Sequence, residues 1–267
     1  MKYLVTGGAG FIGSNYVRRI LDGTLSGIES VVVLDKMTYA GNRSNLPDEI
    51  SGQFQFVEGD ICDQELFRSL LAGVDSIINF AAESHVDRSI RDSSVFIKTN
   101  IEGVNSMLQV MKSMKSKRFV QISTDEVYGS IEKGAWDENE PLLPNSPYAA
   151  SKASAELIVR AYTRTYGLDT RITRCSNNYG PYHFPEKLIP LVILNALNSK
   201  PLPIYGDGQQ SRCFAHVQDA VDALVKVAFS KETIGRAVNI GNSTEISILK
   251  LAEFIKDRLK SSSDIVF

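Results

Sequence analysis

Two groups of residues in this 267-residue chain have types and spacing suited to proton transfer. Tyr148 and Lys152 are four positions apart in a stretch with helical periodicity, so both side chains are expected on one helical face. A lysine cation near a phenol, with a positive nicotinamide ring alongside, lowers the phenol pKa and makes the phenol a usable base. The alternative interpretation of this pair is an ordinary surface Tyr–Lys contact.

The second group is Thr124, Asp125 and Glu126, which directly follow an apolar run at 119–122. If that run is a strand, the three residues lie at the carboxyl edge of a sheet, where open α/β folds bind ligands. Two carboxyl groups there, one with a raised and one with a normal pKa, would supply a general acid and a general base. An N-cap followed by a solvated helix start uses the same residue types, and the sequence leaves both interpretations open.

A glycine-rich segment predicts a dinucleotide site. Gly8, Gly10 and Gly13 satisfy G-x-G-x-x-G between the first expected strand and the first expected helix, and Gly7 extends the pattern. Such glycines permit a tight turn and let backbone N–H groups approach a pyrophosphate. Asp35 ends the second expected strand at a spacing of 35 − 13 = 22, close to the position of an acid that binds the adenosine ribose. An acid at this position disfavours a 2′-phosphate, so the predicted cofactor is NAD rather than NADP.

The elements that must position these residues alternate along the chain. Short apolar runs typical of buried strands occupy 3–5, 31–34, 54–57, 77–80 and 119–122, and amphipathic stretches typical of helices occupy 12–21, 65–71, 94–114 and 148–166. This alternation predicts an α/β fold with a Rossmann-like, doubly wound parallel sheet. We expect residues 1–174 and 214–240 to form the dinucleotide-binding domain and 175–213 and 241–267 a smaller C-terminal substrate-binding lobe. Because 264–267 resemble the beginning of a strand, we expect that lobe to be truncated.

Composition excludes several classes of function. The 29 Lys and Arg against 31 Asp and Glu give a formal charge of −2, which argues against nucleic-acid or membrane-surface partners. Three cysteines without a C-x-x-C pair predict neither a disulfide framework nor a metal site, and they favour a reducing compartment. No apolar stretch approaches the roughly 20 residues of a membrane span, and the first strand pattern leaves no room for a signal peptide. The sequence therefore predicts a cytoplasmic protein.

These motifs together resemble the extended short-chain dehydrogenase/reductase superfamily and, within it, the dTDP-glucose 4,6-dehydratase family. The resemblance covers residues 1 to about 210 and is carried by 6–13, 39–42, 81–89, 124–126, the Tyr148/Lys152 pair, 177–181 and 184–190. The glycine and Tyr/Lys motifs identify the superfamily. The stretch 83–89 and the Thr-Asp-Glu triplet are more specific, since related decarboxylases and epimerases usually lack the Asp.

The resemblance implies a complete set of site residues. Those expected to bind NAD are Gly7, Gly10, Phe11, Ile12, Gly13, Asp35, Lys36, Asp60, Ile61, Ala81, Ala82, Tyr148 and Lys152. Asp60 also suits a simple helix cap. Those expected to bind the sugar nucleotide are Glu83, Ser84, His85, Thr124, Asn178, Lys187, Arg212 and Asn239. The remaining two histidines, His183 and His216, are expected to be structural.

The resemblance also implies the order of chemical steps. Tyr148 would take the proton of the glucosyl 4-hydroxyl as hydride leaves carbon 4 for NAD, with Thr124 and Lys152 assisting. Glu126 would then remove the proton at carbon 5 while Asp125 protonates the departing 6-hydroxyl. Return of the hydride to carbon 6 would leave a 4-keto-6-deoxy sugar nucleotide and regenerated NAD, which is a hydro-lyase reaction.

Three alternatives remain open from the sequence. The chain has Arg212-Cys213-Phe214 where the dehydratases usually have Arg-Asp-Trp, which leaves the nucleobase undecided between dTDP and UDP. A UDP-glucuronate decarboxylase or a 4-epimerase would use the same NAD. Arg174 is to be checked as a carboxylate partner in the decarboxylase, although we expect it to be structural. A non-catalytic NAD-binding regulator is the third alternative, although such proteins often lose the Tyr or the Lys.

The family resemblance also implies a protein partner, a second copy of this chain. In the implied homodimer, helices 94–114 and 148–166 form a four-helix bundle.

Overall fold

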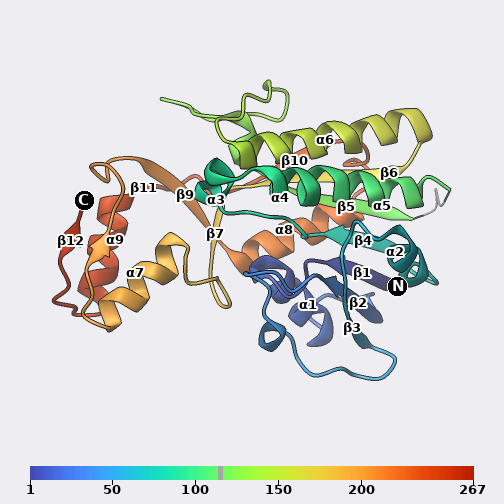
Figure 1. Cartoon of the computed structure of the whole chain (residues 1–267), viewed down its shortest axis with the longest axis horizontal. Coiled ribbons are helices and arrows are strands. Elements are labelled where there is room, and N and C mark those ends of the chain that lie inside the picture. Colours follow the sequence, from blue (N-terminus) through green and yellow to red (C-terminus); the bar gives the residue numbers. More distant parts are fainter. Residues whose placement is uncertain (114–116) are drawn as a thin grey trace.

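The computed structural model describes residues 1–113 and 117–267, and its central feature is a seven-stranded parallel sheet (Figure 1). From one edge to the other its strands are β10 (Ala237–Ile240), β6 (Asp169–Cys175), β5 (Arg118–Thr124), β4 (Ser76–Asn79), β1 (Lys2–Thr6), β2 (Ser30–Asp35) and β3 (Phe54–Glu58). Every neighbouring pair is parallel. The predicted α/β, Rossmann-like doubly wound fold is confirmed.

Helices cover both faces of the sheet because the strand side chains alternate between two cores. On one face α1 (Phe11–Leu21) and α8 (Val217–Phe229) pack over side chains such as Val5 and Val33. On the other, α2 (Gln64–Leu70), α5 (Val104–Met111) and α6 (Pro147–Tyr166) cover Leu4 and Leu34. Figure 1 shows α5 and α6 running along this face of the sheet. The strand order reverses where β1 lies between β2 and β4, which opens a crevice at the carboxyl ends of these strands.

The helix expected at 94–114 is divided into three parts. It begins as α4 (Ser94–Phe96), continues as a π-helix, η2 (Ile97–Gly103), and ends as α5, while its expected last residue, Met114, lies outside the described residues. Within η2, Asn100 is buried and bonds to both backbone groups of Glu83, at 2.9 and 3.0 Å. π-Helical turns frequently occur at functional sites, and this one brings Thr99 to the crevice described below.

A smaller lobe lies beside the sheet, at the left of Figure 1. It contains a three-stranded sheet of β7 (Asn177–Tyr179), β9 (Ser211–His216) and β11 (Glu245–Ser247), the helices α7 (Leu188–Leu197) and α9 (Ile248–Arg258), and the pair β8 (Leu202–Pro203) and β12 (Ile265–Val266). Its separate apolar core includes Val192 and Ile255. The strand expected to start at 264–267 is β12. Strand β9 runs across the expected domain boundary between residues 213 and 214. The division into two domains at the expected residues is therefore kept only as a proposal.

Short helices complete the chain: η1 (Arg43–Asn45), α3 (Val86–Arg91) and η3 (Asp125–Tyr128). In the described part of the chain, no helix combines the length and apolar character needed to cross a membrane. Nor do residues 1–113 and 117–267 contain a group of three or more His, Cys, Asp or Glu side chains that could hold a metal ion.

Candidate active site

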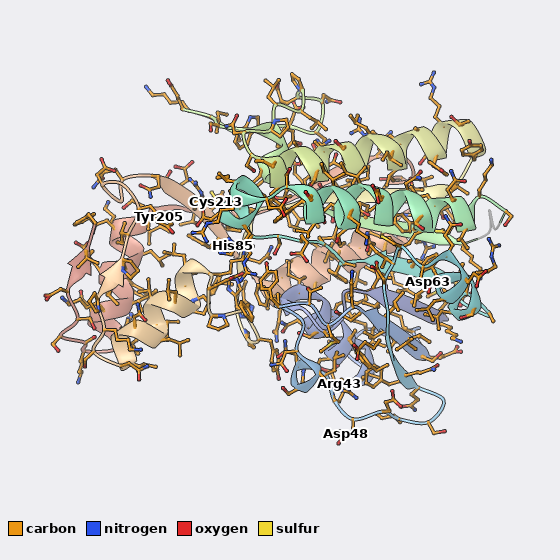
Figure 2. The ribbon with its side chains drawn as sticks, in the orientation of Figure 1. Arg43, Asp48, Asp63, His85, Tyr205 and Cys213 are labelled. Carbon is orange, nitrogen blue, oxygen red and sulfur yellow. The ribbon has the colours of Figure 1, made fainter. Side chains whose placement is uncertain are left out.

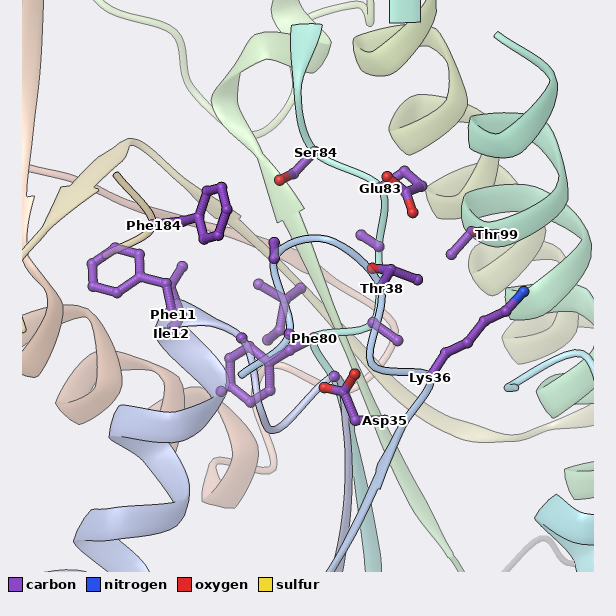
Figure 3. Close-up of a pocket in the computed structure, with 18 of the residues that line it drawn as sticks. Phe11, Ile12, Asp35, Lys36, Thr38, Phe80, Glu83, Ser84, Thr99 and Phe184 are labelled. Atoms are coloured by element: carbon purple, nitrogen blue, oxygen red, sulfur yellow. The ribbon is translucent and has the colours of Figure 1, made fainter. Parts of the chain in front are cut away.

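A cleft at the carboxyl edge of the sheet is lined by all the residues expected to bind the cofactor. Figure 3 shows its labelled side chains from Phe11 and Phe184 on one side to Lys36 and Thr99 on the other, with Thr38, Phe80 and Asp35 between them. The strands β1, β2, β4 and β5 and the turns that follow them provide most of the lining. The switch in strand order therefore positions these distant sequence segments around one space.

Three of the four glycines in this segment, Gly7, Gly10 and Gly13, have different tasks. Gly7 has a φ of +70°, and a Cβ there would lie 2.4 Å from the backbone N of Ala81. A Cβ on Gly13 would lie 2.4 Å from the carbonyl oxygen of Gly7. Gly10 is the residue before α1. Among the described residues, a Cβ on Gly10 would meet only the carbonyl oxygen of Gly7, at 3.4 Å. Gly7 and Gly13 thus permit close strand–turn–helix packing, and Gly10 leaves open space for a ligand at the helix N-terminus.

Asp35 lies buried at the end of β2, within the cleft lining. Its Oδ2 accepts a hydrogen bond from the Ala9 amide and its Oδ1 accepts one from the Met37 amide, both at 2.9 Å. Burial raises the pKa of Asp35, and these two hydrogen bonds oppose that rise. The carboxylate is held in place by the glycine turn, with its remaining lone pairs available to a ribose hydroxyl.

Asp60 is not the cap of the helix that follows it. Asp63 is the N-cap of α2, where its side chain accepts from the amides of Glu65 and Leu66. Asp60 instead forms an ion pair with Lys36, with 2.7 Å between Oδ2 and Nζ, and its Oδ1 accepts from the amide of Cys62. Lys36 and Asp60 thus form one wall of the cleft together.

Tyr148 and Lys152 both line the cleft from the first turns of α6. The amide of Tyr148 donates to Ser89 Oγ at 3.1 Å, and Lys152 Nζ donates to the Ile122 carbonyl at 2.6 Å. Burial lowers the pKa of Lys152 to about 8. Burial also raises the pKa of Tyr148, with the charge of Glu126 adding to that rise. The expected lowering of the phenol pKa is therefore absent from the protein by itself, and a cationic ring in the cleft would act against the rise.

Thr124, Asp125 and Glu126 form the junction of β5 and η3. Thr124 Oγ1 accepts from the Glu126 amide at 3.2 Å and donates to Asp125 Oδ1 at 3.3 Å, so the capping interpretation is correct for the threonine. The two carboxyl groups are partly buried rather than solvated. Burial raises the pKa of both, and the charge of Asp125 adds to the rise at Glu126. Both therefore shift in the same direction, which favours retention of a proton within the pair.

The residues expected to bind the sugar nucleotide divide into two groups. Glu83, Ser84 and Lys187 line the same cleft, where Lys187 Nζ donates to the Ser84 carbonyl at 3.1 Å and burial lowers the lysine pKa. His85 lies at the junction of the two lobes in Figure 2. Its Nε2 is 3.6 Å from Oε2 of Glu186. These contacts connect the end of β4 with the segment that enters α7.

His85, Thr124, Asn178, Arg212 and Asn239 do not line the cleft, and neither do Asp125 and Glu126. Asn178 lies on β7, and Arg212 is exposed on β9, from where its charge lowers the pKa of Asp125 and Glu126 against the larger effect of burial. The side-chain amide of Asn239 forms hydrogen bonds within the protein at both its oxygen and its nitrogen. Its Oδ1 accepts from the Tyr128 hydroxyl at 2.8 Å, and its Nδ2 donates to the Trp136 carbonyl at 3.2 Å.

Several lining residues were not expected from the sequence: Thr38, Thr99, Ser123, His183, Phe184 and Glu186. His183, expected to be structural, stacks on Phe11 with 4.1 Å between ring centroids. In the described part of the chain, buried polar atoms of Ser123, His183 and Glu186 have no hydrogen-bond partner. Such orphaned atoms fit a cleft that takes a polar ligand. Phe184 and Glu186 could have been found from their positions in the quoted 184–190 motif.

Comparison with known proteins places this site in a family. The family model described as GDP-mannose 4,6 dehydratase matches residues 4–266. The dTDP-glucose 4,6-dehydratase of Streptomyces niveus is 49% identical over 269 residues, covering 100% of this chain and 80% of that protein. The resemblance expected from the sequence is confirmed.

Solved structures agree with the sequence relatives. The crystal structure of DesIV, a dTDP-glucose 4,6-dehydratase from Streptomyces venezuelae with NAD and TYD bound, has a TM-score of 0.94 and 50% identity, covering 98% of this chain and 82% of that one. The UDP-glucuronic acid 4-epimerase of Bacillus cereus also matches, with a TM-score of 0.92 at 31% identity, covering 100% and 86%. The fold alone does not distinguish the two reactions, but the identity favours the first. The chain therefore belongs to the GDP-mannose 4,6 dehydratase family and, within it, to the dTDP-glucose 4,6-dehydratases.

Proposed function

We propose that this chain dehydrates dTDP-glucose, or another nucleotide-activated glucose, to the 4-keto-6-deoxy sugar nucleotide, with NAD as a bound cofactor. One observation carries the proposal: two partly buried carboxyl groups, Asp125 and Glu126, directly follow β5, whose Ile122 and Ser123 line the cofactor cleft together with Tyr148. The charges of both carboxyl groups add to the rise in the pKa of Tyr148. An enzyme that only oxidises and reduces carbon 4 needs the tyrosine alone. Elimination of water needs an acid and a base in addition.

The cleft fits NAD in its residue types. The glycine turn provides backbone amides at the N-terminus of α1, and the fixed carboxylate of Asp35 suits a ribose hydroxyl. The residues proposed to hold it are those expected from the sequence, together with Thr38, Thr99 and Ser123. When bound, NAD supplies the hydride acceptor at carbon 4 and the hydride donor for carbon 6.

The residues of this chain then have separate tasks. Tyr148 removes the proton of the 4-hydroxyl. Thr124 orients that hydroxyl, and the Lys152 cation assists by favouring the ionised form of the Tyr148 phenol. Glu126 removes the proton at carbon 5, which the neighbouring ketone acidifies, and returns a proton to carbon 5 when the hydride adds to carbon 6. Asp125 protonates the departing 6-hydroxyl, and the burial that raises its pKa favours the protonated form that this step uses.

Sugar-nucleotide binding is proposed for Glu83, Ser84, His85, Thr124, Asn178 and Lys187, with Arg212 for the diphosphate. A lysine and an arginine suit a diphosphate electrostatically. We leave Asn239 out of this set because both ends of its amide already bond within the protein.

A decarboxylase is the second candidate, and one feature counts against it. Arg174, the residue to be checked as a partner for a substrate carboxylate, is 1% exposed and pairs with Glu156 at 2.7 Å, as expected of a structural residue. Arg174 is therefore unavailable to a ligand. The acid Asp125 would also have no leaving group to protonate in that reaction.

The assembly and location are proposals as well. We propose a homodimer in which η2, α5 and α6 of each copy form a four-helix bundle, since α6 exposes Leu157 and η2 exposes Ile97. The three free cysteines support a cytoplasmic location. Light scattering of wild type and Leu157→Arg tests the dimer, which the arginine should dissociate.

Single-turnover experiments test the proposed reaction. Tyr148→Phe should form no reduced cofactor, because the proton of the 4-hydroxyl is no longer removed. Asp125→Asn should still oxidise carbon 4 but lose water slowly, so enzyme-bound NADH accumulates. Asp137→Asn, a change at an exposed aspartate, is the control. Wild-type turnover by Asp125→Asn would show that its acid role is wrong.

A further inference from the structure

We infer that Tyr128 is a positioning residue for water elimination: its hydroxyl, held by Arg174 and Asn239, fixes the short helix that carries Asp125 and Glu126. The effect that we expect on the kinetics rests on the proposed function. The anchoring of η3 rests instead on contacts among Tyr128, Arg174, Glu156 and Asn239, which take no part in proton or hydride transfer.

The starting point is a fully buried ion pair between α6 and β6. Arg174 Nη2 is 2.7 Å from Glu156 Oε2, Nε lies 3.1 and 3.2 Å from the two carboxylate oxygens, and the side chains are 1% and 0% exposed. Glu156 is one helical turn beyond Lys152, and Arg174 pairs in register with Ser123 at the end of β5. The ion pair therefore joins α6, which carries Tyr148 and Lys152, to β6, the strand beside β5.

Tyr128 connects this ion pair to η3. Its hydroxyl accepts a hydrogen bond from Arg174 Nη1 at 2.6 Å and donates one to Asn239 Oδ1 at 2.8 Å. The ring of Trp136 stacks on its ring, with 5.4 Å between centroids and an interplanar angle of 9°. Tyr128 is 3% exposed, so both its ring and its hydroxyl are fixed.

Tyr128 fixes the position of η3 more than it fixes the position of α6. η3 is one turn, Asp125–Tyr128, and Thr124 caps its start. Tyr128 is its last residue and supplies the side chain that anchors it to β6 and β10. Tyr148 and Lys152 have separate anchors, in Ser89 and in the carbonyl of Ile122.

Loss of the Tyr128 hydroxyl should therefore loosen Asp125 and Glu126 and leave Tyr148 in place. Tyr128→Phe keeps the ring and its stacking but removes both hydrogen bonds. A matched control exists in Tyr162→Phe, which removes a hydrogen bond of the same kind, from a buried tyrosine hydroxyl to Asn105 Oδ1 at 3.1 Å, between α6 and α5. A merely structural role for Tyr128 predicts the same result for both variants.

The kinetic experiment uses NAD-loaded enzyme and dTDP-glucose. For Tyr128→Phe we expect kcat to fall about tenfold, equivalent to about 1.4 kcal/mol, with KM unchanged and enzyme-bound NADH accumulating during turnover. Tyr162→Phe should keep the wild-type kcat and show no such accumulation. Wild-type kinetics in Tyr128→Phe, or slower carbon 4 oxidation without accumulation of NADH, would overturn the inference.

A second measurement needs no substrate. Trp136 is the chain's single tryptophan, so its fluorescence reports on this network directly. Acrylamide quenching in ligand-free protein should increase in Tyr128→Phe and stay at the wild-type value in Tyr162→Phe. Unchanged quenching in Tyr128→Phe would refute the anchoring role, whatever the reaction is. Failure of wild-type enzyme to dehydrate dTDP-glucose would instead refute the proposed function.

Discussion

Replacing Glu156 with glutamine leaves Arg174 buried without a countercharge, and the structure allows the cost to be estimated. Arg174 directs three hydrogen bonds to the Glu156 carboxylate from Nε and Nη2. Removal of one partner of such a buried pair typically costs about 3–5 kcal/mol, mainly because the other charge remains unpaired. The amide introduced by E156Q retains one acceptor oxygen, and Tyr128 keeps its bond to Arg174, so we expect the lower end, about 3 kcal/mol.

The assay is urea unfolding followed by the fluorescence of Trp136, which stacks on Tyr128 within the same network. The double variant E156Q/R174M separates charge from packing. If the unpaired charge causes the loss, removing the guanidinium should recover a large part of the stability that E156Q loses, since apolar replacements of buried pairs are often neutral. A loss below about 1 kcal/mol in E156Q, or a double variant less stable than E156Q, would refute this reasoning.

Two further predictions concern the cofactor cleft. Gly13→Ala should lose about 1–3 kcal/mol of folding stability, because its Cβ would meet the Gly7 carbonyl at 2.4 Å, whereas Gly10→Ala should fold normally but bind NAD weakly in isothermal titration. Equal stability of the two variants would contradict the assigned tasks. Lys152 has a lowered pKa, about 8, so the unfolded state binds more protons above that pH and stability should rise with pH. Wild type should gain about 2 kcal/mol relative to Lys152→Met between pH 8 and 10 in urea titrations, and a flat difference would show that Lys152 titrates normally.

Much of the sheet could be predicted because its signals are local. Each apolar run from Tyr3 to Ile122 is a strand of the parallel sheet, and the glycine turn and Asp35 fall where the motif requires. Parallel strands buried on both faces are continuously apolar, which makes them easy to recognise. Their carboxyl ends meet at one edge, so the residues after them meet in one cleft.

The rest depends on contacts that no local pattern encodes. The π-helix η2 has the same amphipathic periodicity as the α-helices beside it, so the position of Thr99 in the cleft could not be predicted. The amide of Asn239 had the right type for a ligand contact, but Tyr128 and Trp136 occupy it. The phenol of Tyr148 was expected beside a cation that lowers its pKa, and burial reverses that effect. Burial and long-range partners decided each of these cases.

The most direct test of the proposed function is mass spectrometry of products after the purified protein is incubated with dTDP-glucose, UDP-glucose and UDP-glucuronate in parallel, without added NADH. We predict loss of one water from a glucose nucleotide, with dTDP-glucose preferred over UDP-glucose. That preference would also decide the question raised by Arg212-Cys213-Phe214. Loss of carbon dioxide from UDP-glucuronate, with both glucose nucleotides unchanged, would contradict the dehydratase assignment and the acid role of Asp125.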